Sequence, residues 1–179
     1  MRYLTLIRHA KSDWDNPDLD DHDRPLNERG KRVAPLMGRI LASKYFGSEL
    51  HDIPAPDCIL SSTALRARAT AVAIGEACKI PEDDIDLDPS LYEATVSDIF
   101  EVIKELPEEF EHAVLIGHNP GMQSCVERLL GHGQEAEEIG HLPTCGTVMM
   151  RIREDFWAMI DTGSAELVDY LAPKELGIS

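Results

Sequence analysis

Tyr3-Leu4-Thr5-Leu6-Ile7-Arg8-His9-Ala10-Lys11-Ser12 is the stretch that decides the fold of this chain. Residues 3–7 form a short, mostly apolar run that ends at polar residues, which is typical of a buried β-strand. Arg8 and His9 follow this run directly. The sequence therefore predicts a guanidinium and an imidazole at the carboxyl end of a buried strand.

Two further basic residues occupy the same kind of position. Arg66 lies in the first turn of a predicted helix that follows a second apolar run, and His118 follows a third. In open parallel sheets, ligands bind at the carboxyl ends of the strands, and helix N-termini at this edge favour anions. The spacing predicts that Arg8, His9, Arg66 and His118 converge on one anion site.

Phosphoryl transfer needs the groups that these four positions would supply. Arginine neutralises a phosphate with paired hydrogen bonds, and a neutral imidazole is a competent nucleophile. Nearby arginines would lower the pKa of that imidazole and keep it neutral. Because the arginines supply the positive charge, we expect neither a metal nor a cofactor.

A structural interpretation stands beside the chemical one. A single arginine is most often a solvated surface residue, and a histidine after a strand is most often a structural hydrogen-bonding group. From the residues alone, both interpretations stay open for Arg8, His9, Arg66 and His118. We expect the structural interpretation to hold for the remaining basic candidates, which are Arg68, His22, His51, His112, His132 and His141.

The charge balance limits the possible partners. The chain has 33 acidic and 17 basic residues among 179, a net charge of −16 with neutral histidine. Such a surface repels nucleic acids and anionic lipids, so neither a nucleic acid nor a membrane is an expected partner. A phosphate would have to be attracted by a local cationic pocket. The length predicts a single domain over residues 1–179.

Cysteine and histidine spacing argues against a metal site. The four cysteines form no C-x-x-C pair, and no two histidines have H-x-x-x-H spacing. Free thiols are typical of a reducing compartment. The first residues lack the features of a signal peptide, and no run approaches the roughly 18 apolar residues of a membrane span. These features predict a cytoplasmic protein.

Apolar runs and helical patterns alternate along the chain. Strands are expected at residues 3–7, 57–60 and 113–116. Helices are expected after a cap at Asn27, over residues 64–78, from a cap at Thr95 as far as Pro107, and from Asn119 as cap and Pro120 as first residue through Leu130. This alternation favours an α/β layer fold with a largely parallel sheet.

The last part of the chain has a different pattern. Residues 147–152 and 156–160 are β-prone and are separated by the charged turn Arg153-Glu154-Asp155, which predicts a hairpin. Residues 165–171 fit either a further strand or a short helix. The hairpin would add at least one antiparallel strand to the sheet.

Three local features complete the pattern. Residues 12–25 are rich in aspartate and proline and predict a long surface loop of the kind that is often functional. Pro35 should kink or delay the helix that follows. Residues 87–92 are expected to be irregular or weakly extended.

Four ordered motifs resemble the histidine phosphatase superfamily, which has the phosphoglycerate mutase-like fold. The motifs are Leu6-Ile7-Arg8-His9-Ala10-Lys11-Ser12-Asp13-Trp14, Arg24-Pro25-Leu26-Asn27-Glu28-Arg29-Gly30, Ser61-Ser62-Thr63-Ala64-Leu65-Arg66-Ala67 and Leu115-Ile116-Gly117-His118-Asn119-Pro120-Gly121. The R-H-A-K-S form and the tail, residues 163–176, resemble the SixA branch of phosphohistidine phosphatases. The resemblance covers nearly the whole chain. It implies a three-layer fold, with helices on both faces of a mostly parallel central sheet and a late antiparallel hairpin.

The resemblance also implies roles for the basic residues. His9 would attack phosphorus and carry a transient phosphoryl group. Arg8, Arg66 and His118 would hold the phosphate oxygens. Neither a metal nor a cofactor takes part in this scheme.

The sequence departs from the family pattern in two places. Ala10 replaces the glycine of the R-H-G fingerprint, which restricts the backbone there. Larger relatives have a glutamate general acid, and Glu93 lies near that place, where a solvated loop carboxylate is the other interpretation. Ser12 and Asp15 occupy positions where some relatives contact phosphate.

Whether the site has a general acid affects which substrate is expected. Expelling an alkoxide requires a proton donor, whereas a protonated imidazole is a far better leaving group. We therefore expect a phosphatase of protein phosphohistidine, perhaps acting on a histidine-containing phosphotransfer domain. A phosphatase of small phosphate compounds and a non-catalytic phosphate-binding sensor remain the alternatives.

Overall fold

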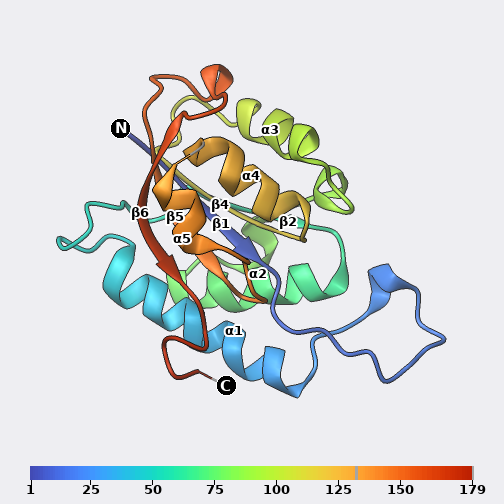
Figure 1. Cartoon of the computed structure of the whole chain (residues 1–179). Helices are drawn as coiled ribbons and strands as arrows, with labels where there is room; N and C mark the ends of the chain where they lie inside the picture. Colours follow the sequence, from blue (N-terminus) through green and yellow to red (C-terminus); the bar gives the residue numbers. More distant parts are fainter. Residues whose placement is uncertain (132, 179) are drawn as a thin grey trace.

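A six-stranded mixed sheet forms the centre of the computed structural model, which describes residues 1–131 and 133–178 (Figure 1). The strands are β1 (Arg2–Arg8), β2 (Cys58–Ser62), β3 (Ile85–Asp88), β4 (His112–Gly117), β5 (Thr147–Ile152) and β6 (Ala165–Leu171). Their order is β3-β2-β4-β1-β5-β6; the first four are parallel to one another, and β5 runs antiparallel to both of its neighbours, β1 and β6. The largely parallel sheet is confirmed. His132, expected to be structural, lies outside the described residues.

Helices cover both faces of this sheet. They are α1 (Glu28–Ile40), α2 (Leu65–Cys78), α3 (Val96–Lys104), α4 (Gly121–Leu130) and α5 (Gln134–Ile139), with a π-helical turn at Leu41–Tyr45 and short 3-10 turns at Asp21–Asp23, Glu82–Asp84, Pro89–Leu91 and Trp157–Met159. Helices α1 and α2 lie on one face, and α3 and α4 lie on the other (Figure 1). Within the described part of the chain, no helix is both long enough and apolar enough to cross a membrane.

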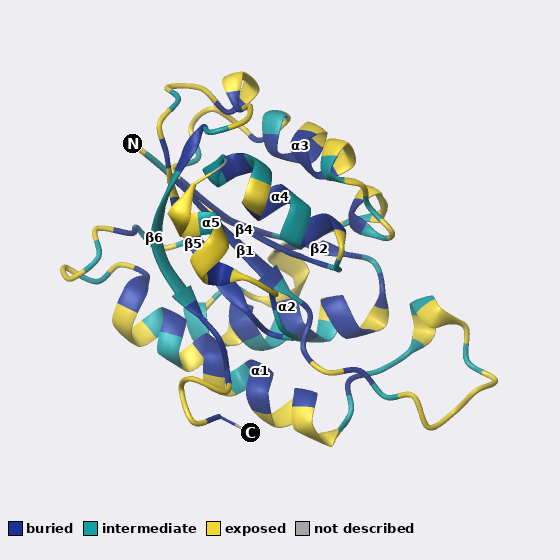
Figure 2. Cartoon of the chain, in the orientation of Figure 1, coloured by how far each residue is buried: buried dark blue, intermediate teal, exposed yellow. Residues whose placement is uncertain are grey.

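Strand β1 lies between β4 and β5 and is buried on both faces (Figure 2). Leu4 and Leu6 belong to the core on the side of α3 and α4. Tyr3 and Ile7 belong to the core on the side of α1 and α2. Because successive side chains of a strand alternate between faces, a strand buried on both sides reads as a near-continuous apolar run.

The prediction that residues 156–160 form the second strand of a hairpin is wrong. Strand β5 pairs antiparallel with β6, and residues 156–160 contain a 3-10 turn. The physical reason is the anchoring of Trp157, which is fully buried and donates from its indole nitrogen to the carbonyl of Phe110 at 3.1 Å. Burial of this side chain against another segment outweighs the β-propensity of its neighbours. Residues 165–171, left open between strand and helix, form a strand.

Two helix expectations also need correction. Pro35 does not delay α1, which starts at Glu28 and contains the proline. The buried face of α1, which includes Val33 and Met37, stabilises the helix despite the loss of one backbone donor. Asn119 does not cap α4, because its side chain donates to the carbonyl of Leu142 at 3.0 Å.

A short edge strand precedes α3. The segment expected to be irregular, residues 87–92, contributes its first two residues to β3 and three more to a 3-10 turn. Ile85 is buried whereas Leu87 is largely exposed. The short length and half-exposed face of β3 explain its weak pattern in the sequence.

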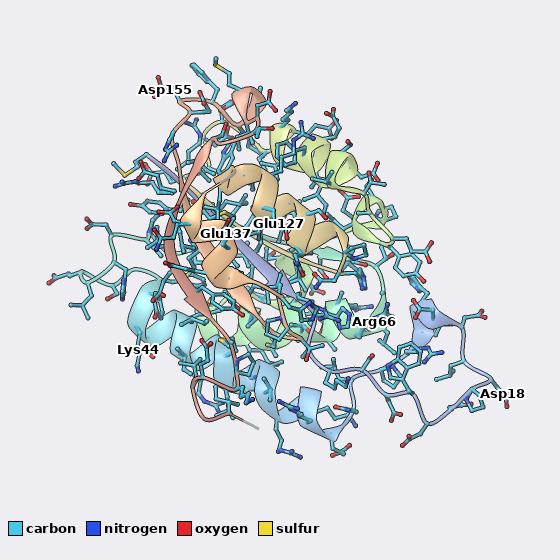
Figure 3. All side chains as sticks on the ribbon, viewed as in Figure 1. Asp18, Lys44, Arg66, Glu127, Glu137 and Asp155 are labelled. Atoms are coloured by element: carbon cyan, nitrogen blue, oxygen red, sulfur yellow. The ribbon has the colours of Figure 1, made fainter. Side chains whose placement is uncertain are left out.

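The loop over residues 12–25 extends away from the sheet, with Asp18 near its far end (Figures 1 and 3). Its two ends lie side by side. Ser12 forms a β-bridge with Leu26, and the amide of Asp13 donates to the carbonyl of Pro25 at 2.8 Å. The predicted long surface loop is therefore closed at its base.

Candidate active site

Three parallel strands end at the same edge of the sheet and bring the basic residues to it. Arg8 is the last residue of β1 and His9 follows it, while His118 follows β4. Arg66 lies in the first turn of α2, just past the end of β2 (Figure 3). The N-termini of α2 and α4 lie at this edge, so the positive ends of their dipoles favour an anion there.

His9 has a defined tautomer. The residue is 8% exposed, and Nδ1 of its ring lies 2.7 Å from the carbonyl oxygen of Ala10. Because a carbonyl can only accept, Nδ1 carries the hydrogen and the lone pair is on Nε2. Burial lowers the pKa of His9 to about 4, and the charges of Arg66 and Arg8 act in the same direction. The imidazole is therefore neutral near pH 7, with Nε2 available as a nucleophile.

Arg66 contacts both imidazoles with one edge of its guanidinium. Its Nε donates to His9 Nε2 at 3.4 Å, and its Nη2 lies 3.3 Å from His118 Nδ1. The other edge is held by Asp21, with Nη1 donating to the backbone oxygen at 2.6 Å and Nη2 to Oδ2 at 2.9 Å. The side chain is thus fixed at its outer edge, and its inner edge has the fork geometry that suits phosphate oxygens.

His118 faces His9 across the site. The two ring centroids are 5.0 Å apart. Nε2 of His118 lies 2.7 Å from Ser62 Oγ, and Nδ1 accepts from Arg66. Burial, followed by the proximity of His9 and Arg66, lowers the pKa of His118 to about 3. The site thus contains two neutral imidazoles beside a guanidinium.

Arg8 has a donor that the protein leaves unpaired. Its Nη1 donates to the carbonyl of Leu142 at 3.0 Å and lies 3.5 Å from His141 Nε2. Its Nε is buried and has no hydrogen-bond partner among residues 1–131 and 133–178. Burial also lowers the pKa of the guanidinium. An unpaired buried donor on the residue that precedes His9 is a group that a bound anion would satisfy.

A cavity of about 630 Å³ adjoins these residues. Its lining includes Arg66 and His118 together with Asp21, Tyr92 and Glu93. The hydroxyl of Tyr92 donates to Asp21 Oδ2 at 2.8 Å, and the bonds from Tyr92 and Arg66 hold the pKa of the Asp21 carboxyl below its usual value despite its partial burial. The cavity therefore presents a carboxylate beside the cationic pocket.

The remaining sequence candidates lie outside this contact network. Ser12 is buried, and its side chain makes no hydrogen bond to Arg8, His9 or Arg66 among the described contacts. Asp15 is exposed on the extended loop. Glu93 lines the cavity but is exposed, with a left-handed backbone at φ 52°. For these three residues a role in the site stays a prediction.

Ala10 is accommodated in place of the usual glycine. It is fully buried, its amide donates to Thr70 Oγ1 at 3.0 Å, and it is not among the described residues with positive φ. No left-handed conformation is needed at this position, so a methyl group causes no strain.

Sequence reasoning missed three side chains of the site. Ser62 and Tyr92 are single hydroxyls in ordinary positions, and nothing in their local pattern marks them. Asp21 is one of several aspartates in the 12–25 loop. Asp21 lies three residues before Arg24, the first residue of a motif that resembles the histidine phosphatase superfamily. This position is the one signal that could have distinguished it.

Comparison with known proteins gives matches over nearly the whole chain. A model of the histidine phosphatase superfamily (branch 1) matches residues 4–113. An uncharacterized protein of Mycobacterium tuberculosis is 32% identical over 174 residues, which cover 94% of this chain and 100% of that protein.

Two solved structures, each described as a putative phosphohistidine phosphatase SixA, are similar in fold and sequence. The protein from Nakamurella multipartitia has a TM-score of 0.81 and 25% identity, covering 96% of each chain. The protein from Agrobacterium tumefaciens has a TM-score of 0.78 and 30% identity, covering 96% of this chain and 98% of its own. These similarities confirm the phosphoglycerate mutase-like fold and the resemblance to the SixA branch.

Proposed function

Because this chain belongs to the histidine phosphatase superfamily (branch 1), and this membership supports phosphatase activity, we propose that it hydrolyses phosphate compounds with His9 as the nucleophile. One observation carries the proposal. The Nδ1–H of His9 is held by the Ala10 carbonyl, so the lone pair is on Nε2, which lies 3.4 Å from the guanidinium of Arg66. A phosphoryl group bound by Arg66 would meet that lone pair.

The reaction would proceed in two displacements. In the first, the Nε2 lone pair forms a bond to phosphorus. The bond from phosphorus to the leaving group breaks, and the leaving group takes the electron pair of that bond. In the second, water attacks phosphorus, the P–Nε2 electrons return to His9, and phosphate leaves with the oxygen of the water. Arg8, Arg66 and His118 would bind the phosphate oxygens. Because guanidiniums supply the positive charge, the scheme needs neither a metal nor a cofactor.

The substrate that the site favours is protein phosphohistidine. The carboxyl of Asp21 has a lowered pKa and is ionised, so it is not a proton donor for an alkoxide. A phosphorylated imidazole does not need such a donor when its second nitrogen is protonated. The two similar structures described as phosphohistidine phosphatases support the same substrate class. A histidine-containing phosphotransfer domain is a partner of this kind.

A phosphatase of small phosphate compounds is the second candidate, and Glu93 is the observation that favours it. Glu93 lines the same cavity as His118 and could protonate an ester oxygen. If Glu93 is a general acid, Glu93→Gln slows alkyl phosphate hydrolysis far more than phosphohistidine hydrolysis. Equal effects on both substrates would reject that role. A non-catalytic sensor would bind phosphate with the same pocket and release none.

Phosphate release tests the proposal directly. Wild type and His9→Ala are compared on a phosphohistidine-bearing protein, p-nitrophenyl phosphate and a sugar phosphate. We expect release from phosphohistidine that is lost in His9→Ala, while the variant still binds inorganic phosphate. His51→Ala is the matched control, because His51 stacks on Tyr45 and takes no part in the proposed chemistry.

Each other result has a defined meaning. Activity retained in His9→Ala would reject His9 as the nucleophile. Release mainly from the small esters would favour the second candidate. No phosphate release from any of the three substrates, together with intact phosphate binding, would favour the non-catalytic sensor.

A further inference from the structure

The carboxylate of Asp21 fixes the outer edge of Arg66, but it also brings a negative charge to the side of the phosphate pocket. It lies 2.9 Å from the guanidinium of Arg66, which itself contacts both His9 and His118. A negative charge so close to a phosphate pocket opposes an anion. The charge of Asp21 therefore suits a second role besides the positioning of Arg66.

The leaving group supplies such a role. In a phosphohistidine substrate, one ring nitrogen carries the phosphoryl group and the other carries a hydrogen, so the ring is a cation when it is ready to leave. Arg8 and Arg66 would repel that cation. A carboxylate beside the pocket would attract it and accept its N–H.

The contacts of Asp21 leave one oxygen for this purpose. Oδ2 accepts from Arg66 at 2.9 Å and from Tyr92 at 2.8 Å. Oδ1 accepts no hydrogen bond from the residues that the structure describes, and its nearest charged neighbour is Arg24 Nε at 3.7 Å. The Asp21 side chain is 46% exposed and lines the cavity together with His118. Asp21 is therefore held by two hydrogen bonds at Oδ2, whereas Oδ1 is in an ion pair with Arg24 at 3.7 Å and keeps its capacity to accept a hydrogen bond.

The nucleophile shows the same arrangement. His9 donates its Nδ1–H to a carbonyl oxygen at 2.7 Å, and this bond would stabilise the ring when Nε2 carries the phosphoryl group. Transfer from a substrate imidazole to His9 exchanges phosphorus between two chemically similar rings. The substrate ring then needs an equivalent acceptor for its own N–H.

We propose that Asp21 recognises the leaving imidazole of a phosphohistidine substrate by accepting the N–H of its second ring nitrogen. The inference rests on the proposed function. The His9 Nε2 lone pair forms the new P–N bond, the electrons of the old P–N bond return to the substrate ring, and that ring leaves neutral with its hydrogen still in place. Asp21 thereby stabilises the cationic, phosphorylated form of the substrate ring without donating a proton.

The test compares leaving groups in one variant. Asp21→Asn keeps the size of the side chain and an acceptor for Arg66 and Tyr92, but it removes the charge. Phosphoimidazole leaves as imidazole, whereas p-nitrophenyl phosphate leaves as an anion. We expect the ratio of kcat/KM for phosphoimidazole to kcat/KM for p-nitrophenyl phosphate to fall about tenfold or more, as for loss of a charge-assisted hydrogen bond. The inhibition constant of inorganic phosphate should be equal or lower, because a nearby negative charge is gone.

Asp20→Asn is the matched control. Asp20 precedes Asp21 in the same loop, is exposed, and its side chain makes no cap hydrogen bond. The substitution changes the net charge by the same amount, so its ratio of kcat/KM values should equal that of wild type. An equal fall for Asp20→Asn would mean that overall charge and not this carboxylate is responsible.

The possible failures are distinguishable. If wild type hydrolyses phosphoimidazole and Asp21→Asn has an unchanged ratio, the role of Asp21 is rejected and the proposed function stands. If both substrates lose rate equally and phosphate binds more weakly, Asp21 only positions Arg66 and the inference is rejected. If wild type releases phosphate from p-nitrophenyl phosphate but not from phosphoimidazole or a phosphohistidine protein, the proposed substrate is wrong and the inference fails with it.

Discussion

Protonation of one buried histidine, His112, should destabilise the fold in mild acid. His112 is fully buried at the start of β4, away from the catalytic edge. Its Nδ1 lies 2.8 Å from the carbonyl oxygen of Pro54, and its Nε2 lies 2.9 Å from Thr5 Oγ1. The carbonyl requires a hydrogen on Nδ1, so Nε2 accepts from the hydroxyl and the ring is neutral. A second ring proton would disrupt this arrangement.

The size of the effect follows from the pKa. Burial lowers the pKa of His112 from 6.5 to about 4, against the smaller opposing effects of Pro54 and Asp57. The unfolded chain binds a proton below pH 6.5 that the folded chain resists, so stability is full above that pH and is lost as the pH falls towards 4. At about pH 5 the loss from this residue is about 2 kcal/mol. That is a substantial part of a typical unfolding free energy of about 5–15 kcal/mol.

Urea unfolding measures the effect. Wild type and His112→Gln are unfolded at about pH 7.5 and about pH 5, with the fluorescence of buried Trp157 as the signal. We expect the free energy of unfolding of wild type to fall by about 2 kcal/mol more than that of the variant. His9 and His118 are present in both proteins, so their contributions cancel. An equal fall in the two proteins would refute the reasoning.

Three further predictions follow from local contacts. Ser62→Ala removes the hydroxyl that lies 2.7 Å from His118 Nε2, and we expect the inhibition constant of inorganic phosphate to rise about tenfold. Ser61→Ala is the control, and an unchanged inhibition constant in Ser62→Ala would mean that Ser62 does not orient His118. Gly121→Ala would place a Cβ 2.3 Å from the carbonyl oxygen of Ala94, so the free energy of unfolding should fall by about 2 kcal/mol. Gly133→Ala, where nothing lies within 4 Å of the new Cβ, should change it far less, and equal changes in the two variants would contradict the steric reason. EDTA should leave phosphate release unchanged, because Arg8 and Arg66 supply the positive charge; a clear loss would indicate a metal.

The contact among His9, Arg66 and His118 could be anticipated from sequence because each follows a strand of one parallel sheet. The short apolar runs locate these strands, and parallel strands end at a common edge. The partners of the basic residues could not be anticipated in the same way. The Ser62 hydroxyl has no local pattern, and the Asp21 carboxylate has only its position three residues before Arg24, because both are selected by distances across the fold.

The fold errors have a similar origin. Residues 156–160 have β-propensity, but the burial of Trp157 against the segment at Phe110 determines their conformation. Pro35 lowers the local helix propensity, yet packing stabilises α1 through it. In each case an interaction with a distant segment outweighs the local preference.

The closed base of the 12–25 loop would allow most of the loop to be replaced as a unit. The Ser12–Leu26 bridge and the bond from the Asp13 amide to the Pro25 carbonyl hold its two ends together, and the Asn27 amide donates to the carbonyl of Lys11 at 3.0 Å. Loops of other lengths could be grafted onto this base if they keep an aspartate at the place of Asp21, because Asp21 holds the guanidinium of Arg66. A library of such grafts would vary the residues around that aspartate, while His9, the proposed nucleophile, stays the same in every member.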